Sequence, residues 1–293
     1  MRAEALHIEL LHACPLNCLA CDHRGLGRAR LGARLLRRVF SAPEFSGVKL
    51  VSFSGGEPLL HPELPVIIKR AAAAFPRAAL VVLTGLSGGA RLKKFMLALP
   101  APLAGRLHLG SSLDGPPRVH DRMRGRAGAF AALKASHAWL KKNFPGLSTG
   151  FTFTATSENA AHFYGAWLTA RRLGAPLALQ FLVPNANTPA LELTAADRKA
   201  LAAGIKAVLA ESPGAAAGKG GLAAALRFLR GRSAPAACGA GTTFFMLSPE
   251  GSFYLCPFHK KLTSPLAGLA GLRARLKGPA RKTCGRCFLR CAL

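Results

Sequence analysis

The 293-residue chain has few acidic residues and no long apolar run that is free of charge. Its 40 lysines and arginines outnumber 13 aspartates and glutamates, so the formal net charge is +27. No uncharged apolar stretch reaches the roughly 18 residues that a membrane helix needs. Glu4, His7 and Glu9 interrupt the first apolar run, which excludes a secretory signal peptide. We therefore expect a protein without a membrane segment.

Two explanations account for the excess of positive charge. One is an acidic partner, such as a leader peptide, a nucleic acid or a phosphorylated substrate. The other is compositional drift in a genome that favours alanine, glycine and arginine. The basic residues are spread along the chain, and aromatic residues do not interleave with them as single-strand binding requires. We therefore expect no specific recognition of nucleic acid.

Three of the eight cysteines form the most informative motif. They follow the apolar run 6–11 with the spacing Cys-x3-Cys-x2-Cys: Cys14, Cys18 and Cys21. Thiolates are soft ligands that suit iron–sulfur clusters, and three of them leave one iron of a cubane free for another ligand. From spacing alone, a zinc site completed by His12 or His23 stays open, as do unrelated buried thiols. Because such clusters are assembled under reducing conditions, we expect a cytoplasmic protein.

A glycine-rich turn follows the next apolar run, 48–51. Its residues are Gly55, Gly56, Glu57 and Pro58. Glycines and a proline after a strand mark a tight turn where the backbone comes close to a ligand, and Glu57 adds an acceptor for an ammonium group. Together, the turn and the three cysteines resemble the radical S-adenosylmethionine (SAM) superfamily. The resemblance implies a 4Fe–4S cluster on the three cysteines, SAM on its free iron, and the turn lining the methionine end of SAM.

Strand-like and helical runs alternate along the first part of the chain. Mostly apolar strand-like runs occupy 6–11, 48–53, 79–83, 106–113, 150–155 and 177–183, and helical patterns occupy 34–39, 63–75, 91–99, 129–143 and 160–173. Repeated strand–helix units predict a parallel sheet. We expect the α/β class, with a partial (β/α)6 TIM-like barrel over 1–190, a helical linker over 191–235 and a small cysteine-rich hairpin-plus-helix domain over 236–293. Functional residues should lie at the carboxyl ends of the strands.

The ends of the fourth and fifth strands carry further candidates. A Ser-Leu-Asp-Gly segment followed by His-Asp-x-x-Arg-Gly occurs here, as in peptide-modifying branches of the resembled family. We take Asp114 and Asp121 as candidate catalytic carboxylates, ahead of Glu158, and Arg124 as a candidate partner of a carboxylate. Ser112 and Thr154 are candidate cofactor contacts. The alternatives are ordinary turn chemistry, helix capping by Asp114 and strand packing by Thr154.

Five further cysteines gather near the end of the chain: Cys238, Cys256, Cys284, Cys287 and Cys291. The runs 244–248 and 252–255 flank a Pro-Glu-Gly turn and predict a hairpin. From spacing alone, a structural zinc ribbon is one interpretation. The pattern also resembles the twitch domain, a short relative of the SPASM extension. That resemblance implies one auxiliary 4Fe–4S cluster on Cys238, Cys256, Cys284 and Cys287, and it leaves Cys291 as a spare, a substitute ligand or a free thiol.

The two motif sets together predict a radical SAM oxidoreductase that cleaves SAM to a 5′-deoxyadenosyl radical and removes hydrogen from a substrate. An auxiliary cluster suits oxidation or crosslinking, as in a peptide maturase or an alcohol dehydrogenase. We expect a peptide or small-molecule substrate and an electron donor such as flavodoxin or ferredoxin. The alternative is a non-catalytic protein that binds nucleic acid or another polyanion and whose fold is stabilised by zinc or iron–sulfur sites. One departure from the family is Ala20, which stands where an aromatic residue is usual.

Overall fold

The computed structural model describes residues 3–23, 25–183, 185–216, 221–231 and 239–257, together with 264–265 and 288. Within these residues the strands form one sheet with the order β6-β5-β4-β3-β2-β1-β7-β8-β9. The strands are β1 (Ala5–Glu9), β2 (Leu50–Ser54), β3 (Ala79–Leu83), β4 (Leu107–Ser112), β5 (Ser148–Ala155), β6 (Leu177–Phe181), β7 (Phe244–Leu247), β8 (Ser252–Tyr254) and β9 (Ser264–Pro265). The helices are α1 (Ala33–Phe40), α2 (Leu64–Ala74), α3 (Gly89–Leu97), α4 (Ala101–Gly105), α5 (Pro117–Arg124), α6 (Ala129–Asn143), α7 (Phe163–Arg172), α8 (Ala195–Glu211) and α9 (Leu222–Leu229).

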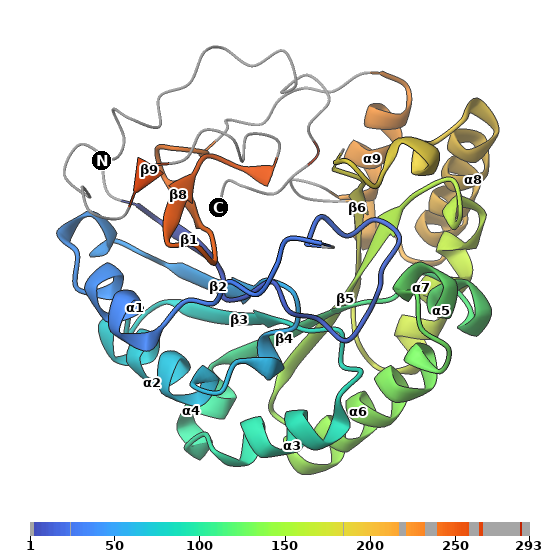
Figure 1. The fold of residues 1–293 in the computed structure, drawn as a ribbon. Helices are drawn as coiled ribbons and strands as arrows, with labels where there is room; N and C mark the ends of the chain where they lie inside the picture. Colours follow the sequence, from blue (N-terminus) through green and yellow to red (C-terminus); the bar gives the residue numbers. More distant parts are fainter. Residues whose placement is uncertain are drawn as a thin grey trace.

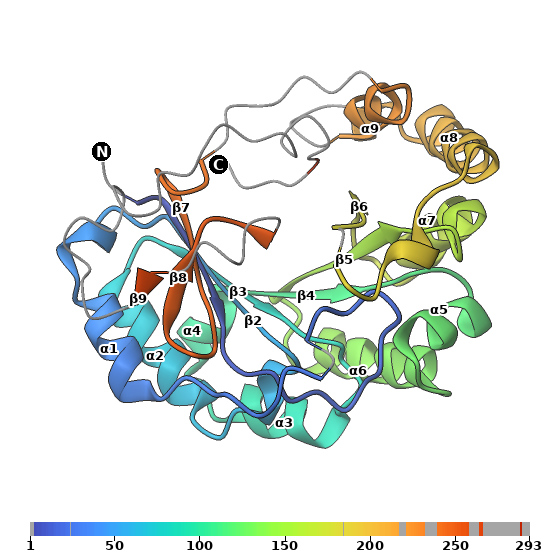
Figure 2. The ribbon, with the colours of Figure 1, turned by 45° about the horizontal axis from the view of Figure 1, so that its top comes forward.

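Strands β1 to β6 curve into a partial barrel, and the helices cover its outer side (Figures 1 and 2). Every neighbouring pair among these six strands is parallel. Parallel strands need crossover connections, and the helices between them provide these. The expected α/β fold with a partial (β/α)6 barrel is therefore confirmed. Among the described residues, no helix is both long and apolar enough to span a membrane.

The two faces of the barrel strands differ in polarity. On β1 and β2, Leu6, Ile8, Val51 and Phe53 are fully buried against the helices. The alternate positions carry polar side chains, and in the parallel register His7 lies beside Ser52 and Glu9 beside Ser54. The apolar runs of the sequence predicted strands covered on both faces. The polar inner row instead gives the barrel an interior that can hydrogen-bond a ligand.

The predicted hairpin is present as β7 and β8, which pair in antiparallel fashion. Strand β7 also pairs in parallel with β1, from Ala5 opposite Phe244 to Ile8 opposite Leu247. Aromatic packing supports this contact, because the ring of Phe45 lies 5.9 Å from that of Phe245 and 5.5 Å from that of Phe253. The hairpin thus extends the barrel sheet. The boundary between barrel, linker and C-terminal domain stays a prediction.

Helix α5 lies in the segment that the sequence analysis treated as loop and motif. Pro117 occupies its first turn, where the missing N–H costs nothing. Gly125 ends it with a left-handed φ of 59°, which glycine adopts without a steric penalty. In the predicted linker, α8 packs on α7 with Leu201, Ile205 and Val208 buried. Helix α5 matters most for the site, because it reaches the cysteine loop.

Candidate active site at the cysteine loop

The three N-terminal cysteines lie on one loop that leaves the carboxyl end of β1. Their thiols are half-buried, and none forms a disulfide. Burial, helped by the nearby Cys18, Glu57 and Cys21 groups, raises the pKa of the Cys14 thiol to about 11, although a backbone hydrogen bond from Leu16 opposes the shift. Three neighbouring thiolates would repel one another. The loop therefore needs positive charge, which the irons of a cluster supply.

The donor set on the cysteine loop fits an iron–sulfur cluster. Three thiols lie on one loop, and thiolates are the soft ligands that hold the irons of a cubane. His12 and His23, which could have completed a zinc site, hydrogen-bond each other through their Nδ1 atoms at 2.8 Å.

The glycine turn is joined directly to the start of the cysteine loop. Gly56 N donates to Leu11 O at 2.6 Å, and Glu57 N donates to Ala13 O at 2.9 Å. A Cβ atom at Gly55 would lie 2.4 Å from Leu11 O, and one at Gly56 would lie 2.3 Å from Ala13 O. The glycines are thus required where two backbones meet, which places the turn against the loop that carries the cysteines.

Glu57 is buried beneath this turn, and its side chain connects the ends of β2 and β3. Its carboxylate accepts hydrogen bonds from Leu59 N at 3.0 Å, Thr84 Oγ1 at 2.8 Å and Gly85 N at 2.8 Å. Burial raises the pKa of Glu57, and these three hydrogen bonds oppose the shift. The contact with an ammonium group that the sequence suggested would have to share these oxygens. Pro58 begins a short 3₁₀ turn, Pro58–Leu60, directly after it.

Asp114 and Arg124 form a buried ion pair beside the cysteine loop. Arg124 Nε donates to Asp114 Oδ2 at 2.7 Å, and Arg124 Nη2 contacts the same oxygen. Arg124 Nη1 lies 3.8 Å from Cys18 Sγ. His120 Nδ1 lies 3.6 Å from Asp114, and burial lowers the pKa of His120 to about 4. Arg124 was expected to pair with a carboxylate, and in this structure that carboxylate is Asp114.

Asp121, the other candidate catalytic carboxylate, binds backbone groups. Its Oδ2 accepts from Gly128 N and its Oδ1 from Phe130 N, both at 2.7 Å. These N–H groups belong to the first turn of α6, so Asp121 caps that helix from α5. Glu158 forms an ion pair with Arg122 at 2.9 Å. The contacts of Asp121 and Glu158 are those of structural carboxylates.

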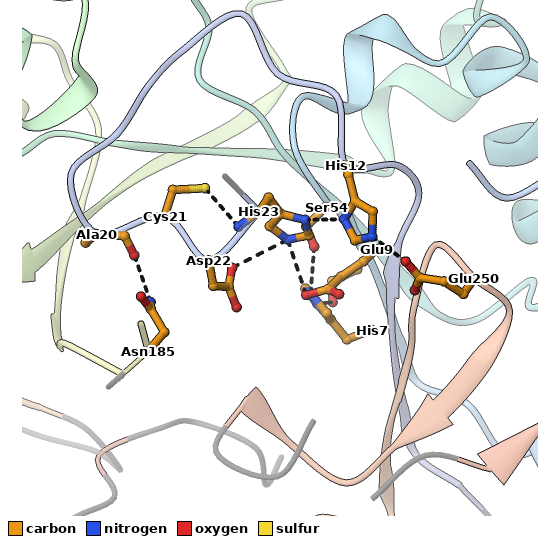
Figure 3. A network of polar contacts seen from close by, with 11 residues as sticks. His7, Glu9, His12, Ala20, Cys21, Asp22, His23, Ser54, Asn185 and Glu250 are labelled. Atoms are coloured by element: carbon orange, nitrogen blue, oxygen red, sulfur yellow. Dashed lines mark hydrogen bonds and ion pairs between the residues drawn. The ribbon is translucent and has the colours of Figure 1, made fainter. Parts of the chain in front are cut away.

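A polar network that the sequence analysis missed lies inside the barrel (Figure 3). His12 Nε2 donates to Glu250 Oε1 at 2.5 Å, which links the β7–β8 turn to the cysteine loop. Glu9 Oε1 lies 3.5 Å from His23 Nε2, and His7 hydrogen-bonds the hydroxyl groups of Ser52 and Ser54 at 2.7 Å. The sequence did carry a sign of this network. The polar residues His7 and Glu9 stand at alternate positions of the otherwise apolar first strand.

The segment after β6, at the far end of the barrel sheet from β1, holds the later part of the cysteine loop. Asn185 Nδ2 donates to Ala20 O at 3.1 Å, and Asn187 Nδ2 donates to Cys21 O at 2.7 Å. Both asparagines follow β6, and no feature of the local sequence indicated this contact. Ser112 and Thr154 lie half-buried on the neighbouring strands β4 and β5. The predicted cofactor contacts therefore share the barrel edge with the cysteine loop.

The predicted auxiliary site is described only at one position. Cys256 follows β8 and is half-buried. The other predicted ligands, Cys238, Cys284 and Cys287, lie outside the described residues, as does Cys291.

Comparison with known proteins identifies the family. A family model described as the radical SAM superfamily matches residues 8–165, more than half of the chain. Fe-coproporphyrin III synthase of Methanosarcina barkeri is 32% identical over 114 residues, which are 39% of this chain and 26% of that protein. PqqA peptide cyclase of Rhodopseudomonas palustris is 31% identical over 142 residues, 47% of this chain and 36% of that protein. The chain thus spans well under two thirds of these relatives.

The fold has a close structural match. The crystal structure of Streptococcus suis SuiB bound to S-adenosylmethionine superposes with a TM-score of 0.70 at 12% identity, over 95% of this chain and 66% of SuiB. The chain belongs to the radical SAM superfamily of enzymes. Membership implies a 4Fe–4S cluster and SAM as cofactors.

Proposed function

We propose that this radical SAM protein cleaves SAM reductively and removes a hydrogen atom from a substrate bound inside the barrel. The observation that carries the proposal is the placement of three half-buried thiols on one loop beside a polar barrel interior. When bound, the cluster and SAM would supply an electron and the 5′-deoxyadenosyl radical. The protein's own share is to hold the thiolates, to orient cofactor and substrate, and to exclude water.

The proposal assigns SAM to the carboxyl edge of the barrel. Its methionine end would lie at the turn Gly55–Pro58, which is joined to the cysteine loop by two backbone hydrogen bonds. Its ribose would lie near Ser112 and Thr154, at the ends of the adjacent strands β4 and β5. Ligands in parallel barrels bind at this edge, where loops from different strands meet.

A peptide is the substrate class that we favour. SuiB, whose fold this chain shares, has been crystallised bound to the precursor peptide SuiA, and a segment of the chain resembles PqqA peptide cyclase. The inner row of His7, Ser52 and Ser54 offers donors and acceptors for peptide groups. The net charge of +27 would attract an acidic peptide. A small-molecule substrate remains the second candidate, since Fe-coproporphyrin III synthase is also a relative.

We also propose one auxiliary 4Fe–4S cluster on Cys238, Cys256, Cys284 and Cys287. The support is the cysteine spacing together with the β7–β8 hairpin, after which Cys256 follows. Its role would be to accept an electron from the substrate radical, which suits oxidation or crosslinking. An electron donor such as flavodoxin or ferredoxin in the cytoplasm would reduce the first cluster.

Oxidation of a substrate radical also releases a proton, and Glu9 is the acceptor that we favour. It ends β1 on the inner side of the sheet, beside Ser54 and within 3.5 Å of His23. Asp114 and Asp121, which the sequence suggested for this role, are engaged by Arg124 and by the start of α6. A general base must reach the proton that it takes, and Glu9, which also interacts with Tyr254, is the carboxylate of the polar inner row of β1 and β2.

Anaerobic reconstitution tests the proposal. Wild-type protein should bind iron and sulfide in equal amounts and release 5′-deoxyadenosine from SAM under strong reductant. Cys18→Ala should lose the absorbance of that cluster and all 5′-deoxyadenosine. Cys256→Ala, the matched control at the auxiliary site, should still cleave SAM but form no product. Bound zinc in place of iron, or an iron-loaded protein that never cleaves SAM, would contradict the proposal.

A further inference from the structure

The carboxyl end of α5 holds the cysteine loop on both sides of Cys18. Asn17 N donates to Arg124 O at 3.2 Å, and Leu19 N donates to Met123 O at 3.0 Å. The loop after β1 crosses toward α5 at the mouth of the barrel (Figure 1). These backbone contacts place the side chain of Arg124 next to the sulfur of Cys18.

The guanidinium of Arg124 connects a buried carboxylate to that sulfur. Nε and Nη2 bind Asp114 Oδ2, and Nη1 lies 3.8 Å from Cys18 Sγ, within hydrogen-bond reach of a sulfur acceptor. The side chain of Asp114 is 0% exposed and that of Arg124 is 17% exposed. Since the guanidinium is a rigid planar fork, fixing two of its nitrogens on Asp114 also fixes the direction of the third.

The hydrogen-bond donors of this fork favour negative charge on the sulfur. Asp114 and Arg124 neutralise each other, and His120, the other ionisable group beside Asp114, is uncharged near neutral pH because burial lowers its pKa to about 4. The nitrogen of Arg124 that does not bind Asp114, Nη1, donates to Cys18 Sγ. Hydrogen bonds and positive charge at a cluster's thiolates stabilise its reduced form, which carries one more electron.

We propose that Arg124, oriented by Asp114, is a positioning residue that donates to Cys18 and raises the reduction potential of the N-terminal cluster. This inference rests on the proposed function, because it requires a cluster at Cys14, Cys18 and Cys21. The inference also assigns a shared role to the Ser-Leu-Asp-Gly and His-Asp-x-x-Arg-Gly segments. The aspartate of the first segment and the arginine of the second act together on the cysteine loop.

The test is a redox titration of reconstituted protein, monitored by electron paramagnetic resonance on the cluster signal that changes when SAM is added. Arg124→Gln removes the charge and should make reduction at least tenfold less favourable, a shift of about 59 mV to more negative potential for one electron. Asp114→Asn keeps the shape of the side chain but removes the charge that orients the guanidinium of Arg124. It should also make the reduction potential more negative, but by less than Arg124→Gln does. Arg122→Gln is the matched control, because Arg122 lies on the same helix, is 69% exposed and pairs with Glu158.

The outcomes separate this inference from the proposed function. Wild-type iron content with an unchanged potential in Arg124→Gln, or in Asp114→Asn, would overturn the inference while SAM cleavage stands. If Arg124→Gln takes up no cluster or does not fold, the reduction potential of Asp114→Asn decides, and an unchanged potential there overturns the inference. A wild-type protein that binds the cluster but never cleaves SAM refutes the proposed function and leaves the titration valid.

Discussion

Gly125 is a position where one added methyl group should damage the site. Its φ of 59° is left-handed, which costs an alanine about 1–2 kcal/mol. An added Cβ would also lie 2.1 Å from Asn17 O, where ordinary contact begins at 3.4 Å. Relieving that overlap requires α5 and the cysteine loop to separate, and overpacking of this kind costs about 1–3 kcal/mol. Gly125→Ala should therefore lower the free energy of unfolding by about 2–5 kcal/mol in total.

Gly174 provides the control for the cost of placing alanine in a left-handed backbone conformation. It follows the carboxyl end of α7 with a φ of 66°, and nothing lies within 4 Å of its hypothetical Cβ. Gly174→Ala should thus cost only the left-handed conformation, about 1–2 kcal/mol. The assay is urea unfolding of the metal-free proteins, followed by iron uptake on reconstitution. Gly125→Ala should also bind less iron, because separation breaks the hydrogen bonds on either side of Cys18.

Equal destabilisation by Gly125→Ala and Gly174→Ala, with equal iron uptake, would refute the argument that α5 and the cysteine loop are in obligatory contact. A larger loss of stability at Gly125 with normal iron uptake would confirm the contact but show that it does not position the cysteines.

Three further predictions concern the ionisable groups His120, Asp121 and Glu9. Because burial lowers the pKa of His120 from 6.5 to about 4, the unfolded chain binds more protons between these values, so stability should fall by up to about 3 kcal/mol as the pH drops from 6.5 to 4. His120→Asn, which keeps an acceptor for the Asp114 N–H, should flatten that slope in urea titrations. Asp121→Ala should cost about 1 kcal/mol of stability through the lost cap of α6 and leave 5′-deoxyadenosine release intact. Glu9→Gln should instead retain 5′-deoxyadenosine release and lose product, and normal product formation would remove Glu9 as the proton acceptor.

The barrel elements were predictable because their signals are local. The run 79–83 matches β3 and the pattern 129–143 matches α6 residue for residue, since apolar periodicity and flanking turn residues define both. Helix α5 was missed because Pro117–Arg124 is short and mostly polar, so its pattern resembles a loop. The pairing of β7 with β1 was also missed. It joins residues more than two hundred positions apart, and no local periodicity encodes such a partner.

The candidate site, like the fold, was only partly predictable from the sequence. Cys14, Cys18 and Cys21 were recognisable as a ligand set because all three lie on one short loop with a regular spacing. The roles of the carboxylates were not readable, because Asp114 and Asp121 stand in similar turn-like segments and differ only in what packs against them. The structure directs Asp114 to Arg124 and Asp121 to the start of α6. It also adds Glu9 and Glu250, which the sequence presented only as isolated charges.

The amino-acid sequence by itself determined the family and the parallel barrel and predicted the three thiols as ligands, because each depends on residues that are neighbours in the chain. The tertiary structure decided which side chains reach those ligands. Arg124 comes to the cysteine loop from the helix after β4, Asn187 from the loop after β6, and Glu250 from the hairpin beside β1. Such contacts depend on how the sheet curves and closes, and no spacing along the chain specifies that.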